Sequence, residues 1–356
     1  MSFSDKYTGL LLEMLSFPAL SREESARAGF LQKWLSEEGF TVNRTGNNLL
    51  VSAKNKKGKP GFLLCSHIDT VPPAKGWEQD PFVPVVEGNR ISALGANDAG
   101  ASVVAMIAAF ENLALIDGNL EPQLLLCAEE EVSGKGGLES VLPELNNISM
   151  ALVGEPTGMQ PAVAQRGLMV VDASVKGKSG HAARNEGVNA ISLAIKEIGK
   201  IQELSFPEPS RWLPEPSLQV TMIRAGSVHN VVPDECNYVI DVRSNDIYNN
   251  EDILKMLRGI SDAELIPRSL RLKAKTLDED HLLNRLIAEM GLKPFGSSTL
   301  SDMALLPFPS VKIGPGESAR SHTSGEWIST DEIRNGIIIY TELGKRIISA
   351  NLKEIS

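Results

Sequence analysis

The chain has 356 residues, 42% of them hydrophobic and 22% charged, which are values of an ordinary globular protein long enough for two domains. Its formal net charge of −10 disfavours nucleic acid and anionic membranes as partners. The chain does not open with a basic segment and an apolar core, no apolar run approaches the roughly 18 residues that span a bilayer, and the cysteines lack metal or redox spacing, so we expect a cytoplasmic protein with reduced thiols.

The first 164 residues alternate between helical patterns and short apolar runs. Leu, Phe and Trp recur with helical spacing over residues 5–17 and 22–39, and Ser21 with Glu24 predicts a capping box for the second helix. Four continuous apolar runs and an apolar helix follow, at residues 48–53, 62–65, 99–115, 123–128 and 150–154. Continuous runs are typical of strands covered on both faces. The pattern predicts a three-layer α/β/α domain with a mixed sheet.

Beyond residue 164 the pattern changes to half-exposed strands and amphipathic helices. Strands are expected at residues 169–175, 218–223, 238–242 and 264–274, and helices at 189–204 and 251–260. A helix, a strand and a helix then follow at 281–290, 311–313 and 331–348. We therefore predict one domain made of residues 1–164 and 277–356, interrupted by an inserted α+β, ferredoxin-like domain of residues 165–276.

Residues that can bind metal gather after the predicted strands. In doubly wound sheets, sites form outside the carboxyl ends of the strands. The residues after three apolar runs are His67 and Asp69, then Glu129, Glu130 and Glu131, and then Glu155. Asp98 stands just before the apolar helix, and His322 lies in a late segment. Such ligands suit zinc, cobalt or manganese, and their number fits two ions that share a bridging carboxylate. A spare carboxylate could then move a proton between a water molecule and a leaving group.

Taken singly, each of these residues has an ordinary interpretation as a core histidine, a helix cap, an acidic turn or a surface loop residue. Taken jointly, the coincidences favour a metal centre. Other chemistries fail on spacing. Residues 177–179 read Gly-Lys-Ser but lack the earlier glycine of a phosphate-binding loop, and the sequence has neither a GxGxxG after its first strand nor a GxSxG.

The ordered segments SHIDTVP, the stretch around Asp98, EEE, VGEPT and SHT resemble those of the zinc aminoacylase, acetylornithine deacetylase and glutamate carboxypeptidase family. The resemblance covers essentially the whole chain. GKSGHAA and VIDVR stand where that family has its lid or dimerisation domain, and SSTLSDMA and IGPG resemble its C-terminal signatures. Two positions depart from the family pattern: Ala99 replaces a lysine that usually follows the aspartate, and Glu129 replaces the aspartate of the acidic run.

The resemblance implies a role for each candidate residue of the metal centre. His67 and Glu155 would hold one ion, and Glu131 and His322 the other. Asp98 would bridge the two ions. Asp69 would orient the ring of His67. Glu130 would act as the general base and later as the general acid.

Substrate-binding roles are implied for three residues of the inserted domain. His181 would stabilise the oxyanion, in the neighbouring subunit of a homodimer, and Arg243 and Asn230 would bind the substrate's carboxylate. The alternatives are that residues 177–181 form a polar turn and that Arg243 makes a structural ion pair with Asp241 or Asp246. The resemblance assigns no role to Asp302.

The activity that the resemblance implies is metal-dependent hydrolysis of the amide bond of an N-acyl amino acid. The first hypothesis is removal of an acetyl or succinyl group from an ornithine- or citrulline-like substrate in arginine biosynthesis, with two ions of zinc, or of cobalt or manganese. A succinyl-diaminopimelate desuccinylase or a dipeptidase or carboxypeptidase is the alternative within enzymes. A catalytically inactive protein that binds metal or amino acids is the alternative outside them.

Overall fold

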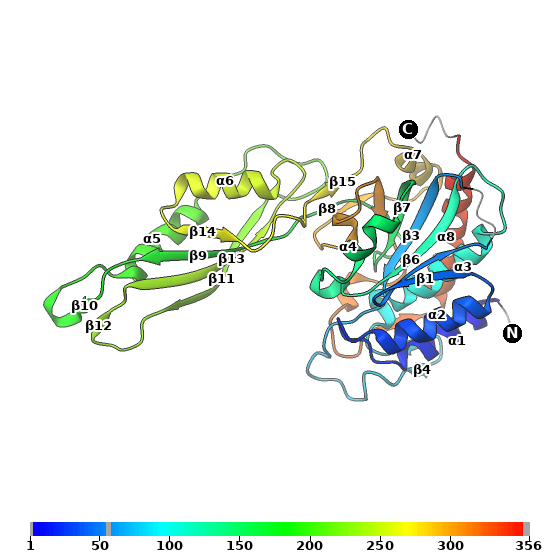
Figure 1. Cartoon of the computed structure of the whole chain (residues 1–356), viewed down its shortest axis with the longest axis horizontal. Helices are drawn as coiled ribbons and strands as arrows, with labels where there is room; N and C mark the ends of the chain where they lie inside the picture. The colour runs from blue at the N-terminus through cyan, green and yellow to red at the C-terminus, as the bar shows by residue number, and fades with distance from the viewer. Residues whose placement is uncertain (1–2, 55–57, 352–356) are drawn as a thin grey trace. The chain divides into compact units, whose positions relative to one another are not determined.

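The computed structural model describes residues 3–54 and 58–351 (Figure 1). The chain divides into two compact units. We name the units after the roles predicted from the sequence: the catalytic unit comprises Met1–Val163, Leu277–Phe295 and Ser301–Ser356, and the lid unit comprises Ala164–Thr276 and Gly296–Leu300. None of the helices in the described part of the chain has an apolar stretch long enough to cross a membrane.

A large mixed sheet forms the centre of the catalytic unit. Its strands within this unit are β1 (Thr41–Thr45), β2 (Asn48–Ser52), β3 (Gly61–His67), β6 (Glu121–Cys127), β7 (Ile148–Gly154) and β17 (Ser310–Lys312). The short strands β8 (Ala162–Gln165), β15 (Lys275–Thr276) and β16 (Phe295–Ser297) lie where the chain passes from one unit to the other. The order is β1-β2-β6-β3-β7-β17-β8-β15, with β16 beside β8. Strand β3 runs parallel to β6 and β7, and β17 runs parallel to β7, so the carboxyl ends of these strands meet at one edge.

Helices cover this sheet as predicted for a three-layer fold. They are α1 (Phe3–Leu15), α2 (Ser25–Glu37), α3 (Ala101–Leu113), α4 (Leu138–Val141), α7 (Leu282–Glu289) and α8 (Thr330–Ser349). Helix α3 packs against β3, β6 and α8 (Figure 1). Side chains of α4 and of residues 303–308 join an apolar cluster with β3, β6 and β7. A small sheet of β4 (Val85–Glu87), β5 (Arg90–Ser92) and β18 (Trp327–Ser329) leads into α8.

The lid unit has its own sheet and its own core. Strands β9 (Met169–Lys176), β11 (Ser217–Ala225), β13 (Glu235–Arg243) and β14 (Glu264–Pro267) form an antiparallel sheet in the order β11-β13-β9-β14. Helices α5 (Ala190–Gln202) and α6 (Asn250–Ile260) share its apolar core. The chain order βαββαβ is that of the predicted α+β insert. A ribbon of β10 (Gly180–His181) and β12 (Val231–Val232) extends beyond the sheet (Figure 1).

Two local predictions were wrong. Helix α2 begins at Ser25, and its N-cap Glu24 makes no side-chain capping bond, because the residues expected to form the capping box bind loops instead. Ser21 Oγ donates to Asp69 (2.7 Å), and the Glu24 carboxylate accepts from the backbone N–H of Glu129 (3.1 Å). The strand expected over residues 264–274 ends at Pro267, a residue that has no N–H with which to continue the ladder.

Candidate metal centre

His67 is the last residue of β3 and is almost fully buried, with 2% of its surface exposed. Its Nδ1 lies 3.1 Å from the backbone oxygen of Asp69 and 3.4 Å from Oδ1 of the same residue. Because a carbonyl oxygen can only accept, Nδ1 carries a proton, and Nε2 is the nitrogen that faces the other carboxylates. Nε2 lies 3.1 Å from Asp98 Oδ1 and 3.8 Å from Glu155 Oε1.

His322 approaches the same carboxylates from a loop near the end of the chain. Its Nε2 lies 3.0 Å from Glu131 Oε2 and 3.7 Å from Asp98 Oδ2. Asp98 therefore has one oxygen toward each histidine. The hydrogen bond with Glu131 raises the pKa of His322 to about 9, so a metal ion that binds this nitrogen has to displace a proton.

The ligand atoms of these residues are close enough to share ions. Among the described residues, His67, Glu130 and Glu155 form one group within 4.8 Å of one another, and His67, Asp98 and Glu131 form a second. Glu129 belongs to neither group. Its carboxylate accepts from the Gly136 N–H (3.3 Å), and a Cβ on Gly134 would collide with Glu129 Oε2. The first glutamate of the run therefore fills the glycine-rich turn, and the second and third face the centre.

Asp69 organises two of the loops around the centre. Its carboxylate accepts from Ser21 Oγ (2.7 Å) and from the backbone N–H groups of Glu130 (3.0 Å) and Glu131 (3.1 Å). Burial alone would raise the pKa of Asp69, but its hydrogen bonds with His67, Ser21 and the Glu131 N–H hold this pKa below the usual value. The ionised Asp69 thus fixes both the ring of His67 and the acidic segment.

Glu326 holds the Asp98 segment and was not identified from the sequence. It is 2% exposed, and its carboxylate accepts from the backbone N–H groups of Gly95 (3.1 Å), Asn97 (2.8 Å) and Asp98 (2.9 Å). Burial raises the pKa of Glu326 to about 7. The only sequence signal for this role is that Glu326 lies four residues after His322.

The electrostatics of the cluster fit divalent cations. Burial raises the pKa of Glu155 to about 8, and the negative charges of Asp98 and Glu131 act in the same direction. Burial and the neighbouring Glu155 likewise raise the pKa of Glu130 well above its usual range. Lys312, 1% exposed on β17, opposes this repulsion in part. Buried carboxylates that repel one another are stabilised by bound cations, and imidazole with carboxylate is a donor set that suits zinc, cobalt and manganese.

Comparison with known proteins identifies the family. The Peptidase dimerisation domain of the M20 family matches residues 163–269. The succinyl-diaminopimelate desuccinylase of Aliarcobacter butzleri is 31% identical over 258 residues, which cover 68% of this chain and 70% of that protein. The chain belongs to the M20 family. It is a metal-dependent hydrolase of amide bonds, as the sequence resemblance predicted.

Two further comparisons extend over more of this M20 hydrolase. The acetylornithine deacetylase of Photorhabdus laumondii is 25% identical, over 90% of this chain and 91% of that protein. The Bacillus subtilis YXEP protein, described as a dinuclear metal binding peptidase from the M20 family, superposes with a TM-score of 0.78 at 16% identity and covers 98% of both chains. The second likeness supports the fold.

Cys65, Cys127 and Asp302 form another group of possible ligands in the M20 hydrolase. The two Sγ atoms are 3.6 Å apart, and both thiols belong to the apolar cluster of β3, β6 and β7. Burial raises the pKa of Cys127 well above its usual value. A thiol that stays protonated in apolar surroundings packs as a small hydrophobic side chain, so we interpret this group as core.

The three predicted substrate-binding residues belong to the lid unit. His181 and Asn230 are brought together by the β10–β12 ribbon, in which the Ala182 N–H donates to the Asn230 carbonyl (3.1 Å). His181 is exposed, and its Nδ1 accepts from the Ala183 N–H (3.2 Å), so Nε2 carries the proton. Arg243 makes the ion pair with Asp241 that was the alternative interpretation, through Nε (2.7 Å) and one terminal nitrogen (3.1 Å).

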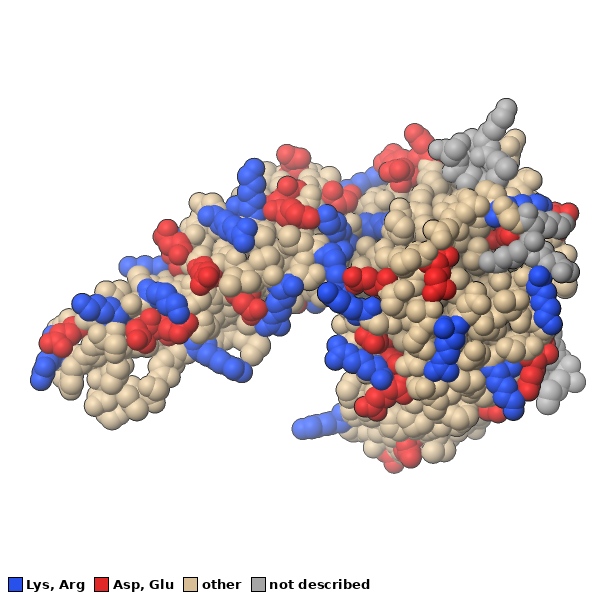
Figure 2. All heavy atoms as spheres, in the orientation of Figure 1, with Lys and Arg blue, Asp and Glu red and all other residues tan. Residues whose placement is uncertain are grey.

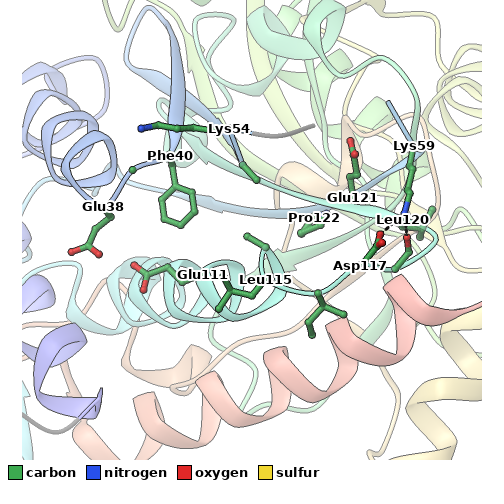
Figure 3. Close-up of a pocket in the computed structure, with 15 residues that line it drawn as sticks. Glu38, Phe40, Lys54, Lys59, Glu111, Leu115, Asp117, Leu120, Glu121 and Pro122 are labelled. Carbon is green, nitrogen blue, oxygen red and sulfur yellow. Dashed lines mark hydrogen bonds and ion pairs between the residues drawn. The ribbon is translucent and has the colours of Figure 1, made fainter. Parts of the chain in front are cut away.

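A cavity of about 400 Å³ in the catalytic unit lies apart from this chemistry (Figure 3). Its lining includes Phe40, Lys59, Leu115 and Asp117 and none of the predicted site residues. The ammonium group of Lys59 forms an ion pair with the Asp117 carboxylate (2.7 Å). On the face of the described residues in Figure 2, acidic and basic side chains are interspersed.

Proposed function

We propose that this M20 hydrolase, acting in the cytoplasm, removes an acetyl or succinyl group from an ornithine- or citrulline-like amino acid in arginine biosynthesis. One ion would be held by His67 and Glu155 and the other by Glu131 and His322, with Asp98 shared; zinc is our first choice of metal. The observation that carries the proposal is the position of Asp98, whose two oxygens lie 3.1 Å and 3.7 Å from histidines 255 residues apart in the sequence.

When bound, the ions would polarise the amide carbonyl and lower the pKa of the attacking water. The side chains of the protein would transfer protons and orient the residues that bind the metal ions. Glu130 stands in one ligand group with His67 and Glu155, so it would lie beside the reacting atoms. Its raised pKa suits a group that accepts a proton near neutral pH and later gives it to the leaving amine. Asp69 keeps the His67 ring in the tautomer that offers Nε2.

The lid unit would supply substrate recognition. Nε and one terminal nitrogen of Arg243 are engaged by Asp241, so its other terminal nitrogen is the donor expected to meet the substrate's carboxylate. Because Nε2 of His181 carries a proton, it can donate to the oxyanion that forms on the amide carbon. Asn230, on the same ribbon, would bind the carboxylate beside Arg243.

A homodimer through the lid unit would bring His181 to the neighbouring subunit's site. The matched dimerisation domain supports this assembly. So does an apolar surface on the outer strand β11 and on α5, where Met222 is 47% exposed, Ile223 53% and Ile195 62%. Sedimentation should show a dimer that Ile195→Asp weakens, and a fully active monomer would exclude the role of His181 in trans.

Two measurements test the proposed reaction. The first is turnover of acetyl-ornithine, acetyl-citrulline, succinyl-ornithine, succinyl-diaminopimelate and simple dipeptides, in which we expect an acetyl or succinyl derivative of ornithine or citrulline to be the best substrate. The second is Glu130→Ala, which should keep its metal and lose about 10²- to 10⁴-fold in turnover because the proton carrier is gone. Near-normal activity of that variant would reject the role of Glu130.

Succinyl-diaminopimelate hydrolysis is the second candidate, because the relative at 31% identity is named a succinyl-diaminopimelate desuccinylase. The same panel of substrates decides between the two candidate reactions, because the first releases ornithine or citrulline and the second releases diaminopimelate. A protein that binds these compounds without turnover in the presence of any added divalent ion would instead be an inactive binding protein.

A further inference from the structure

The backbone of His322 adopts an unfavourable conformation. Its φ of 59° lies in the left-handed region, which residues other than glycine rarely occupy, and 52% of its side chain is exposed. Such conformations persist only where the surroundings enforce them. The ligands of the other ion, His67 and Glu155, stand in contrast at the ends of buried strands β3 and β7. The position of His322 therefore depends on contacts that its loop makes.

Arg320, two residues before His322, ties this loop to helix α8. Its guanidinium lies 3.7 Å from the centre of the Trp327 ring, and its Nη1 donates to both carboxylate oxygens of Glu332, at 2.9 Å and 3.0 Å. Glu332 is itself fixed, because it closes a capping box with Ser329 in the first turn of α8. A planar, permanently charged group that is both stacked and hydrogen-bonded has little freedom.

The loop is short enough for this anchor to reach His322. Thr323 Oγ1 donates to the Arg320 carbonyl (2.7 Å), which closes a turn around His322. On the other side, the Asn97 side chain donates to the Glu317 carbonyl (3.1 Å) and to Ser321 Oγ (3.2 Å). Arg320 is therefore the anchor to the helix, and Asn97 is the anchor to the segment of Asp98.

We propose that Arg320 is a positioning residue for the metal ion held by Glu131 and His322. The inference rests on the two-metal centre of the proposed function. Loss of Arg320 would let His322 relax toward ordinary backbone conformations and away from Glu131 and Asp98. The ion at His67 and Glu155 would keep its ligands, because these are placed by the central sheet. Arg320 thus decides whether the enzyme carries one ion or two when the metal is scarce.

The test is a calorimetric titration of zinc into the metal-free, full-length protein, with turnover measured at each zinc concentration. For Arg320→Met we expect a tenfold or greater loss of affinity for one ion and no change for the other. Turnover should fall at low zinc and return at high zinc. Arg320→Lys keeps the positive charge but lacks the planar guanidinium, so its zinc affinity should lie between those of the wild type and of Arg320→Met. Arg334→Met is the matched control, because Arg334 lies on α8, the helix to which Arg320 is tied, and pairs with the exposed Asp331 (2.8 Å).

Two results would overturn the proposal while the two-metal centre stands. One is an Arg320→Met protein that binds both ions with wild-type affinity, and the other is an equal loss of affinity for both ions, which would indicate a general structural role. A wild-type protein that binds fewer than two ions would instead remove the proposed centre itself. If Arg320→Met does not fold, the comparison is made on Arg320→Lys, for which unchanged binding of both ions would likewise overturn the assignment.

Discussion

Glu197 of the lid unit and Glu155 of the metal centre differ in how their negative charge is compensated. In the lid unit Glu197 is 7% exposed, and its carboxylate accepts from Lys200 (2.8 Å), Ser261 Oγ (2.7 Å) and the Asp262 N–H (2.9 Å). Burial would raise the pKa of Glu197, but these bonds hold it below its usual value. In the catalytic unit, the pKa of Glu155 is raised to about 8 beside other carboxylates. The lid compensates its charge with its own side chains, whereas the centre concentrates charge that bound cations would compensate.

Metal removal should give the largest difference between the units. A chelator that strips the protein should abolish turnover, and added zinc, cobalt or manganese should restore it, because the carboxylate cluster binds through its charge. The core of the lid, which compensates Glu197 internally, should show unchanged amide hydrogen exchange in the same samples. Full turnover in a protein shown by elemental analysis to be free of metal would contradict the interpretation of the cluster.

Glu326→Gln should have an intermediate effect. The amide keeps the shape of Glu326 but loses the charge that accepts three backbone N–H groups of the Asp98 segment. We expect turnover or zinc affinity to fall by about 10- to 100-fold, the usual cost of losing a group that orients a metal ligand. Glu342→Gln, at an ion pair on the surface of α8, is the control and should be neutral. Wild-type affinity and turnover in Glu326→Gln would show that Asp98 is positioned without it.

Glu197→Gln should have the smallest effect and only on stability. At pH 7 we expect a loss of about 1–3 kcal/mol in the free energy of unfolding, because hydrogen bonds to a charged group are lost. Since the folded pKa of Glu197 is lowered, its contribution is present above the usual glutamate pKa and disappears as the pH falls through the folded value. Denaturant titrations of wild type and variant should therefore converge at acidic pH. A constant difference at every pH would mean that packing, not charge, is responsible.

The parts that could be predicted from sequence are those with local signals. Continuous apolar runs marked β3, β6 and β7, and the residue types after them named the side chains that the structure gathers around Asp98. Apart from that of Asp69 with His67, the contacts that position these ligands left no such signal. Ser21 and Glu24 have the spacing of a capping box, yet their side chains bind groups 48 and 105 residues away. Bonds between distant loops follow no period in the sequence, so Glu326 and Arg320 were visible only in the structure.

The central claim, that two divalent ions share Asp98, is tested most directly by anomalous X-ray diffraction from crystals of the zinc-loaded protein. The proposal predicts two anomalous peaks in each chain, one beside His67 and Glu155 and one beside Glu131 and His322, with Asp98 between them. A single peak, or peaks remote from Asp98, would contradict it.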